Sequence, residues 1–328
     1  MSRRLSGAIT EDDHTGFGRP PRRTRPRTKD RPDYSDAPQA MVTTIDRGRY
    51  RCLLGDVALT ATKARALGRK GVIVGDRVGV VGDLSGAEGT LARIVEVLPR
   101  RTVLRRTADD TDPFERPIVA NADQLVIVTA LADPPPRAGM IDRILVAAYD
   151  ARIDPVLCLT KADLATPDAL VAAYAPLGVP ILVTDPDADL AAVRAALAGR
   201  VTVFVGHSGV GKSTLVNRLI PDANRATGEV SELTGKGRHT STSAVAMELP
   251  GGGWIVDTPG VRSFGISHVG PGSILGAFPD LTEFAEDCPR GCRHDSSAID
   301  CALDDAVADG HLAPDRLASF RRMERAFA

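Results

Sequence analysis

The sequence predicts a multi-domain protein with a small all-β barrel, an α/β domain and a short helical C-terminal domain that binds metal. Short β-type runs separated by turn residues begin at Met41. After Pro117, apolar strands alternate with helical segments, and near the C-terminus three of the five cysteines fall within fourteen positions. A chain of 328 residues is long enough for two or three domains.

Composition and charge narrow the class of protein. Apolar runs such as 125–132 are far shorter than the ~20 residues of a membrane span, and no apolar signal core follows Met1. We therefore expect a cytoplasmic protein with no membrane partner. We also expect a monomer. Residues 1–116 carry 23 Lys/Arg against 16 Asp/Glu, whereas residues 117–328 carry 18 against 26. The basic front part suggests a polyanionic partner, with an ordinary solvated surface as the alternative.

The front of the chain divides into a tail, 1–40, and the barrel, 41–116. The tail interleaves arginines with prolines and offers almost no apolar anchor, so we expect a disordered basic segment. Strands in the barrel are expected at 41–45, 50–54, 77–81, 91–98 and 102–104.

Small barrels of the OB type commonly bind RNA. Arginines near the expected strands supply the positive charge for backbone contact. The candidate phosphate-binding residues are Arg47, Arg49, Arg51, Arg100, Arg101, Arg105 and Arg106.

The α/β domain is expected over 117–270, with a parallel sheet covered by helices. Its predicted strands are 124–130, 155–160, 181–184, 201–205, 244–249 and 254–257. Its predicted helices are 140–151, 167–175, 190–198 and 214–220. The C-terminal domain, 271–328, ends in a predicted helix at 314–327.

A P-loop follows the strand 201–205 directly. The segment reads Gly206, His207, Ser208, Gly209, Val210, Gly211, Lys212, Ser213, with Thr214 opening the next helix. This fits G-x-x-x-x-G-K-[ST], in which backbone N–H groups surround the phosphates. Lys212 would reach the β and γ oxygens and the Ser213 hydroxyl would bind Mg²⁺.

Two further motifs identify the nucleotide and its metal. Asp257-Thr258-Pro259-Gly260 ends an apolar strand, where a P-loop protein holds Mg²⁺ with a carboxylate and meets the γ-phosphate with a glycine N–H. Thr160-Lys161-Ala162-Asp163 resembles the [NT]-K-x-D motif that reads guanine. Asp163 can accept two hydrogen bonds from guanine and none from adenine at these places, so GTP is favoured over ATP. Thr184 is a loose match to a further base contact.

The order of these motifs is unusual, because the guanine motif precedes the P-loop and the magnesium motif comes last. In ordinary small GTPases the guanine motif is the last of the three. A sheet can keep its arrangement when one loop is cut and the old termini are joined, since domain termini commonly lie close together. The order therefore indicates a circularly permuted GTPase.

The polar segment 235–242 occupies the position of switch I. One of Thr240, Ser241 or Thr242 should cover Mg²⁺ and the γ-phosphate, with Thr240 and Thr242 favoured. Val261 stands where many GTPases carry a glutamine that positions water, so another group does this or intrinsic turnover is slow. His239 is the nearest candidate, and a solvated loop histidine is the alternative.

Near the C-terminus, three thiols and one imidazole supply the ligand set of one closed, structural zinc site. The alternative is a group of free cysteines. The predicted ligands are Cys288, Cys292, His294 and Cys301.

Together these motifs resemble the RsgA (also YjeQ or YloQ) family of GTPases that depend on the small ribosomal subunit. The resemblance covers 41–328 and rests also on Val74-Gly75-Asp76-Arg77, the segment 120–124, Gly237-Arg238-His239-Thr240 and Phe264-Gly265. It implies an OB-fold, a permuted GTPase domain and a zinc-binding domain. It also implies hydrolysis of GTP to GDP and phosphate, stimulated by the small subunit during its late maturation through rRNA binding, with His239 tied to hydrolysis.

The chain departs from the family pattern in two places. The family spaces its zinc ligands C-x4-C-x-H-x5-C, whereas here one residue fewer precedes Cys292 and one more precedes Cys301. The family's three switch threonines are replaced here by Thr240-Ser241-Thr242, which keeps every hydroxyl.

Two other classes of protein are alternatives to a GTPase. The first is an RNA-binding module with an idle nucleotide site, against which the intact P-loop argues. The second is a P-loop ATPase, against which Asp163 argues.

Overall fold

The computed structural model describes residues 33–68, 71–106, 116–221, 244–258, 274–276 and 278–325. Within these ranges, the helices are all too short or too polar to cross a membrane.

The predicted barrel is confirmed as a closed ring of five strands, β1-β2-β3-β5-β4 with β4 pairing back to β1. Alternate residues point inward, and Val42, Leu59, Val78 and Ile94 are almost fully buried. The third strand is missing from the sequence prediction, because its inward positions include a small Ala61 and so give a weak apolar alternation. The strands are β1 (Gln39–Asp46), β2 (Arg49–Leu54), β3 (Val57–Lys63), β4 (Arg77–Gly82) and β5 (Ala92–Val97).

The strand expected at 102–104 lies outside the barrel. It forms β6 (Val103–Arg106), which pairs with β7 (Arg116–Ala120) in a separate two-stranded sheet. The β1–β4 pairing closes the ring, β1 pairs further with β12 at Thr44 and Val245, and β6 has its partner in β7. The prediction of a barrel strand here is therefore wrong.

The predicted α/β sheet has the strand order β10-β9-β8-β11-β13-β12 and is parallel except for β12. Because parallel strands run the same way, the carboxyl ends of β9, β8, β11 and β13 meet at one edge. The strands are β8 (Gln124–Ala130), β9 (Asp154–Thr160), β10 (Ile181–Val183), β11 (Val201–Val205), β12 (Val245–Glu248) and β13 (Trp254–Asp257).

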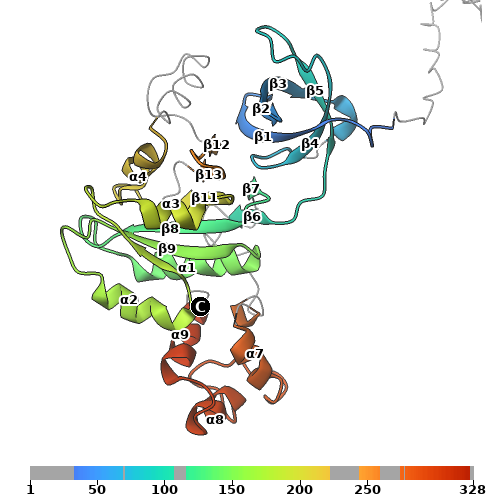
Figure 1. The fold of residues 1–328 in the computed structure, drawn as a ribbon. Coiled ribbons are helices and arrows are strands. Elements are labelled where there is room, and N and C mark those ends of the chain that lie inside the picture. Colours follow the sequence, from blue (N-terminus) through green and yellow to red (C-terminus); the bar gives the residue numbers. More distant parts are fainter. Residues whose placement is uncertain are drawn as a thin grey trace, which may run out of the picture. The chain divides into compact units, whose positions relative to one another are not determined.

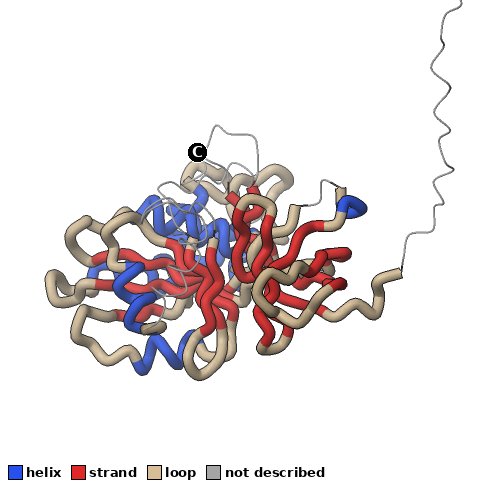
Figure 2. The backbone as a smooth tube through the Cα atoms, turned by 90° about the horizontal axis from the view of Figure 1, so that it is seen from above, coloured by secondary structure: helices blue, strands red, loops and turns tan. Residues whose placement is uncertain are grey.

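Helices cover both faces of this sheet (Figure 1). Leu125 and Ile127 of β8 pack in one core with α1, whereas Val126 and Val128 pack on the opposite face with α3 and α4. In Figure 2 the barrel consists almost wholly of strands and loops, while helices accompany the strands of the α/β sheet. The helices are α1 (Ala138–Asp150), α2 (Asp168–Tyr174), α3 (Ala191–Leu197) and α4 (Lys212–Leu219), with short 3₁₀ turns η1 (Arg65–Leu67) and η2 (Ala175–Leu177).

The C-terminal helices share a core with α1. The ring of Phe278 lies beside Tyr149 of α1 and Phe320 of α9, with centroids 6.2 and 5.5 Å apart. Both phenylalanines are almost completely buried. The helices are α7 (Pro279–Ala285), α8 (Ala302–Ala308) and α9 (Pro314–Glu324), of which the sequence predicts only the last.

Two of the family-like motifs meet where the barrel adjoins the sheet. Asn121 donates from Nδ2 to the Gly75 carbonyl at 2.9 Å and accepts from the Arg101 N–H at 2.9 Å. At Gly75, where φ is +86°, a Cβ atom would lie 2.0 Å from the carbonyl oxygen of Ala120, so only glycine fits. These contacts join the barrel to the residues that lead directly into β8.

Candidate nucleotide-binding site and metal centre

The P-loop connects β11 to α4 at the carboxyl edge of the sheet. A Cβ atom at Gly206 would lie 2.4 Å from the carbonyl oxygen of Val128, so the loop passes β8 too closely for any side chain. Gly209 and Gly211 have φ of +84° and +88°, which other residues rarely adopt. The glycine spacing recognised in the sequence thus corresponds to three separate backbone requirements.

Lys212 and Asp257 come together at this edge. Their strands are neighbours, with Phe204 of β11 opposite Asp257 of β13, and the Lys212 ammonium forms an ion pair with the Asp257 carboxylate. Thr258 donates its hydroxyl to the Phe204 carbonyl at 3.0 Å, which holds the end of β13 against β11. The predicted phosphate-binding and magnesium-binding groups are therefore adjacent, although 45 residues separate them.

The guanine motif is tied to the P-loop through Thr160. Its buried hydroxyl lies 2.5 Å from the Val210 carbonyl and 3.3 Å from the Thr129 carbonyl. Lys161 has a left-handed backbone and donates its ammonium to the Asp133 carbonyl. Asp163 is exposed, and its carboxylate has no side-chain partner in the described part of the chain, so it is accessible to a base.

Thr184 lies beside the guanine motif, because the Ala162 N–H donates to its carbonyl at 3.2 Å. The loop that follows is held by Arg218 of α4, which donates to the carbonyls of Asp185 and Ala188 at 2.8 and 2.5 Å. Arg218 carries no recognisable signal in the sequence, since no local pattern distinguishes this arginine from other basic residues of a helix.

His239, Thr240, Thr242 and Gly260 lie outside the described residues. The site that the described part of the chain assembles therefore comprises the P-loop, the guanine motif and Asp257.

Two arginines of the expected phosphate-binding face have other partners. Arg100 donates from Nε and Nη2 to Asp76 at 2.6 and 2.8 Å, and the Asp76 side chain is fully buried. Because a buried carboxylate needs a hydrogen-bonded cation, Arg100 has a structural role within the barrel, and its contact with RNA stays a prediction. Arg101 pairs with Asp123 at 2.9 Å.

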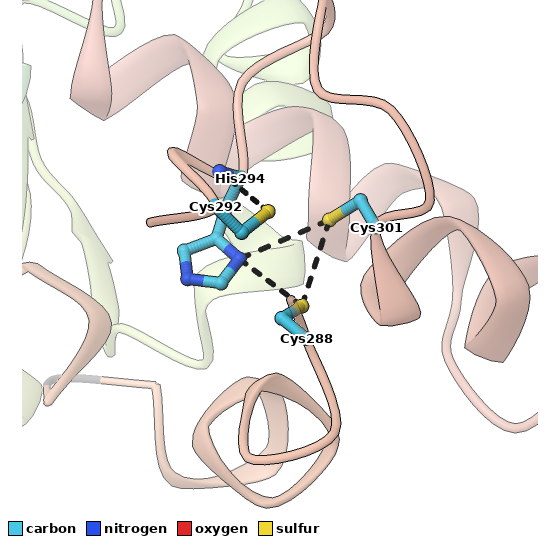
Figure 3. A group of neighbouring side chains, drawn as sticks. All are labelled: Cys288, Cys292, His294 and Cys301. Atoms are coloured by element: carbon cyan, nitrogen blue, oxygen red, sulfur yellow. Dashed lines mark hydrogen bonds between the residues drawn. The ribbon is translucent and has the colours of Figure 1, made fainter. Parts of the chain in front are cut away.

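The predicted metal ligands converge in one cluster (Figure 3). Sγ of Cys288 lies 3.5 Å from Nδ1 of His294 and 4.0 Å from Sγ of Cys301, and the Cys301 sulfur lies 3.8 Å from the same nitrogen. All four ligand atoms, including Sγ of Cys292, lie within 4.8 Å of one another. A tetrahedral zinc ion bound through its usual distances separates such atoms by about 3.5 to 3.8 Å, so the residues fit this metal.

Local backbone geometry brings the ligands together despite their shifted spacing. Gly291 and His294 have φ of +85° and +57°, so the chain turns sharply on both sides of Cys292. Burial raises the pKa of the Cys301 thiol to about 11. Burial lowers the pKa of His294, and the nearby positive charge of Arg321 lowers it further. Metal binding would therefore displace a proton from the Cys301 thiol.

Comparison with known proteins identifies the family. A family model described as RsgA GTPase matches residues 97–267. The chain belongs to the RsgA GTPase family. Small ribosomal subunit biogenesis GTPase RsgA of Pseudomonas aeruginosa is 43% identical over 239 residues, covering 70% of this chain and 69% of that protein. The corresponding RsgA of Azotobacter vinelandii is 44% identical over 239 residues, covering 70% and 68%.

Solved structures support the same fold. The crystal structure of YjeQ from Thermotoga maritima matches with a TM-score of 0.67 at 24% identity, over 88% of this chain and 98% of that one. YloQ, described as a circularly permuted GTPase, matches with a TM-score of 0.65 at 23% identity, over 90% and 96%. The predicted barrel and permuted GTPase domain are thus confirmed. As a member of the RsgA GTPase family, the chain is a GTP hydrolase, which implies GTP bound with Mg²⁺.

Proposed function

We propose that this GTPase acts in late maturation of the small ribosomal subunit, that the subunit stimulates its hydrolysis of GTP, and that it binds rRNA as a monomer. The convergence of Lys212, Asp257 and the Thr160–Asp163 segment at one sheet edge carries the nucleotide part of this proposal. The names of relatives at 43% and 44% identity, both small ribosomal subunit biogenesis GTPases, support the ribosomal part.

In the proposed site, the P-loop N–H groups and Lys212 hold the phosphates. Ser213, exposed in the first turn of α4, and Asp257 would hold Mg²⁺, which would supply positive charge against the phosphate oxygens. The ion pair between Lys212 and Asp257 shows that both groups reach the same point. Lys212 would then exchange its carboxylate partner for phosphate oxygens when nucleotide binds.

The other two domains supply recognition and rigidity in this proposal. The barrel, within 41–116, would contact rRNA phosphates through Arg47, Arg49 and Arg51, which lie on or beside β1 and β2. The C-terminal domain, 271–328, would hold one structural zinc ion through the Cys3His cluster. A closed set of four ligands leaves no open position for substrate, so the metal would stabilise structure and take no part in hydrolysis.

A turnover assay tests the proposal directly. Purified protein is incubated with GTP or ATP and Mg²⁺, with and without small ribosomal subunits, and phosphate release is measured. We expect the protein to hydrolyse GTP faster than ATP, and the small subunit to increase the rate of GTP hydrolysis. In Lys212→Ala both the basal and the subunit-stimulated hydrolysis of GTP should be lost. Equal turnover of ATP would contradict the guanine site, and an unchanged rate with subunits would contradict the ribosomal role.

A further inference from the structure

Arg321 of α9 connects the metal cluster to two helices. Its Nε donates to the main-chain carbonyl of His294 at 2.8 Å. Its two terminal nitrogens donate to the two carboxylate oxygens of Asp304 on α8 at 2.8 and 2.7 Å. The Arg321 side chain is 16% exposed and the Asp304 side chain 48% exposed, so the guanidinium itself is largely enclosed by protein while its carboxylate partner is half-exposed.

These contacts control two ligands that come from separate parts of the loop. His294 has a left-handed backbone, φ +57°, which a residue with a side chain rarely adopts without support. Asp304 lies in the first turn of α8, and its N–H donates to the carbonyl of Cys301 at 2.9 Å. By holding both the His294 carbonyl and Asp304, the guanidinium sets where His294 and Cys301 stand relative to each other.

Charge acts in the same direction. A zinc ion with three thiolates and one neutral imidazole has a net charge of −1, in a cluster whose residues are half-buried or buried. Arginine keeps its charge at any relevant pH and offers a planar fork that matches a carboxylate. The fixed guanidinium places positive charge beside the cluster, although Asp304 already balances that charge, so its main contribution is to position the ligands.

We propose that Arg321 is a positioning residue of the metal centre, which orders His294 and Cys301 for metal binding and slows metal loss. The inference rests on the zinc site proposed above. Groups that orient metal ligands from outside the coordination sphere typically change affinity by about 10- to 100-fold, and we expect an effect of this size.

Arg316 provides a matched control on the same helix. It donates to both carboxylate oxygens of Asp280 at 2.8 and 2.9 Å and to the Pro176 carbonyl at 2.8 Å, and its side chain is 17% exposed. Like Arg321 it binds a carboxylate and a main-chain carbonyl, and its guanidinium also lies 4.5 Å from the centre of the Phe278 ring, but none of these contacts reaches a metal ligand. Arg316→Ala reports what general loosening of α9 does to the metal.

The experiment compares zinc transfer from the full-length protein to a chromophoric chelator in wild type, Arg321→Ala, Arg321→Lys and Arg316→Ala. We expect faster release and ~10- to 100-fold weaker binding in Arg321→Ala, partial recovery in Arg321→Lys, and near wild-type values in Arg316→Ala. Absorption of the Co²⁺-substituted proteins should report a distorted tetrahedral site only in the Arg321 variants.

Equal zinc loss in the two alanine variants, or wild-type release and Co²⁺ spectra in Arg321→Ala, would overturn the inference. If Arg321→Ala does not fold, Arg321→Lys and Asp304→Asn decide the matter by the same measurements. Absence of stoichiometric zinc in the wild-type protein would instead refute the zinc site itself, so the two failures are distinguishable.

Discussion

At the scale of single residues, Asp142 of α1 is the least satisfied polar group in the described part of the chain. Its side chain is 4% exposed, one carboxylate oxygen accepts from Arg322 of α9 at 3.3 Å, and the other has no hydrogen-bond partner there. Burial raises the pKa of this carboxyl group, although the charge of Arg322 and its hydrogen bond oppose the shift. The folded protein therefore favours protonated Asp142 more than the unfolded chain does.

The stability of the protein should fall as Asp142 ionises. A carboxyl group whose pKa is higher in the folded protein than in the unfolded chain stabilises the fold fully at pH values below its unfolded pKa. This stabilisation is lost as the pH rises through its folded pKa. Asp142→Asn imitates the protonated group at every pH. The free energy of unfolding of this variant, relative to that of wild type, should therefore be higher at about pH 7 than at about pH 4. Urea unfolding at the two pH values measures this difference, and a constant difference would contradict it. Arg322→Ala, which leaves the carboxylate without its cation, should destabilise most at the higher pH.

Asp163 should determine the choice of base. In Asp163→Asn the amide keeps one acceptor for guanine N1–H and places a donor opposite the guanine amine, so we expect GTP affinity to fall about 100-fold. Xanthosine triphosphate, which has an oxygen at that ring position, should bind the variant better than GTP does. Equilibrium titration with both nucleotides tests this. Unchanged GTP affinity would remove Asp163 from the base site.

At the scale of elements, the P-loop depends on its close approach to β8. Gly206→Ala would place a methyl group 2.4 Å from the Val128 carbonyl oxygen, so loop and strand must separate. A displacement of ~1 Å at the phosphates can lower the rate about 100-fold, and we expect a loss of that order in GTP turnover with the sheet still folded.

Gly139→Ala serves as the control for this substitution. Gly139 lies in α1 and a Cβ atom there meets nothing within 4 Å, so turnover should be unchanged and the helix slightly more stable. Wild-type turnover in Gly206→Ala would show that the loop tolerates a side chain, and would refute the argument from close approach.

At the scale of the whole molecule, the C-terminal domain has two sources of stability. The sequence offered only the metal, but Phe278, Leu303, Phe320 and Met323 also join the buried core that contains α1. The metal would order the loop of ligands by linking Cys288, Cys292, His294 and Cys301 to one another. The shared core should hold α9 in place even without metal.

Removal of zinc by a strong chelator, or Cys292→Ser, should therefore loosen the loop 288–301 and α8 first. Amide hydrogen exchange should accelerate there by at least ~10-fold, while β8, β9 and the buried side of α9 keep their protection. Uniform acceleration through the sheet would mean that the metal holds the GTPase core as well. No change anywhere would argue against a structural metal.

Stimulation by the ribosomal subunit should depend on His239. This residue lies outside the described part of the chain, and its role is inferred from the sequence, where Val261 replaces a side chain able to orient water. In His239→Ala we expect subunit-stimulated hydrolysis to fall about 100-fold while nucleotide and subunit binding persist. Single-turnover hydrolysis with saturating subunits measures this. A variant as fast as wild type would assign water positioning to another group.

The sequence by itself determined the chemistry of the protein. The P-loop, the guanine motif and the metal ligands each consist of a few consecutive or closely spaced residues, because each depends on local backbone geometry around one ligand. Their order along the chain indicated the permutation. The strands β8 to β13 and the helices α1 to α4 were predicted to within two residues at each end, since their apolar periodicity is strong, whereas β7 was not predicted.

Only the tertiary structure decided which distant groups become partners. Arg100 meets Asp76 across 24 positions, Arg321 meets the His294 carbonyl across 27, and Arg322 meets Asp142 across 180. Pairing with β7 placed β6 outside the barrel, and packing on α1 gave the C-terminal helices their core. Such pairings depend on how the backbone folds in space. The local sequence around an arginine therefore does not distinguish whether its partner is RNA, a buried carboxylate or a metal ligand.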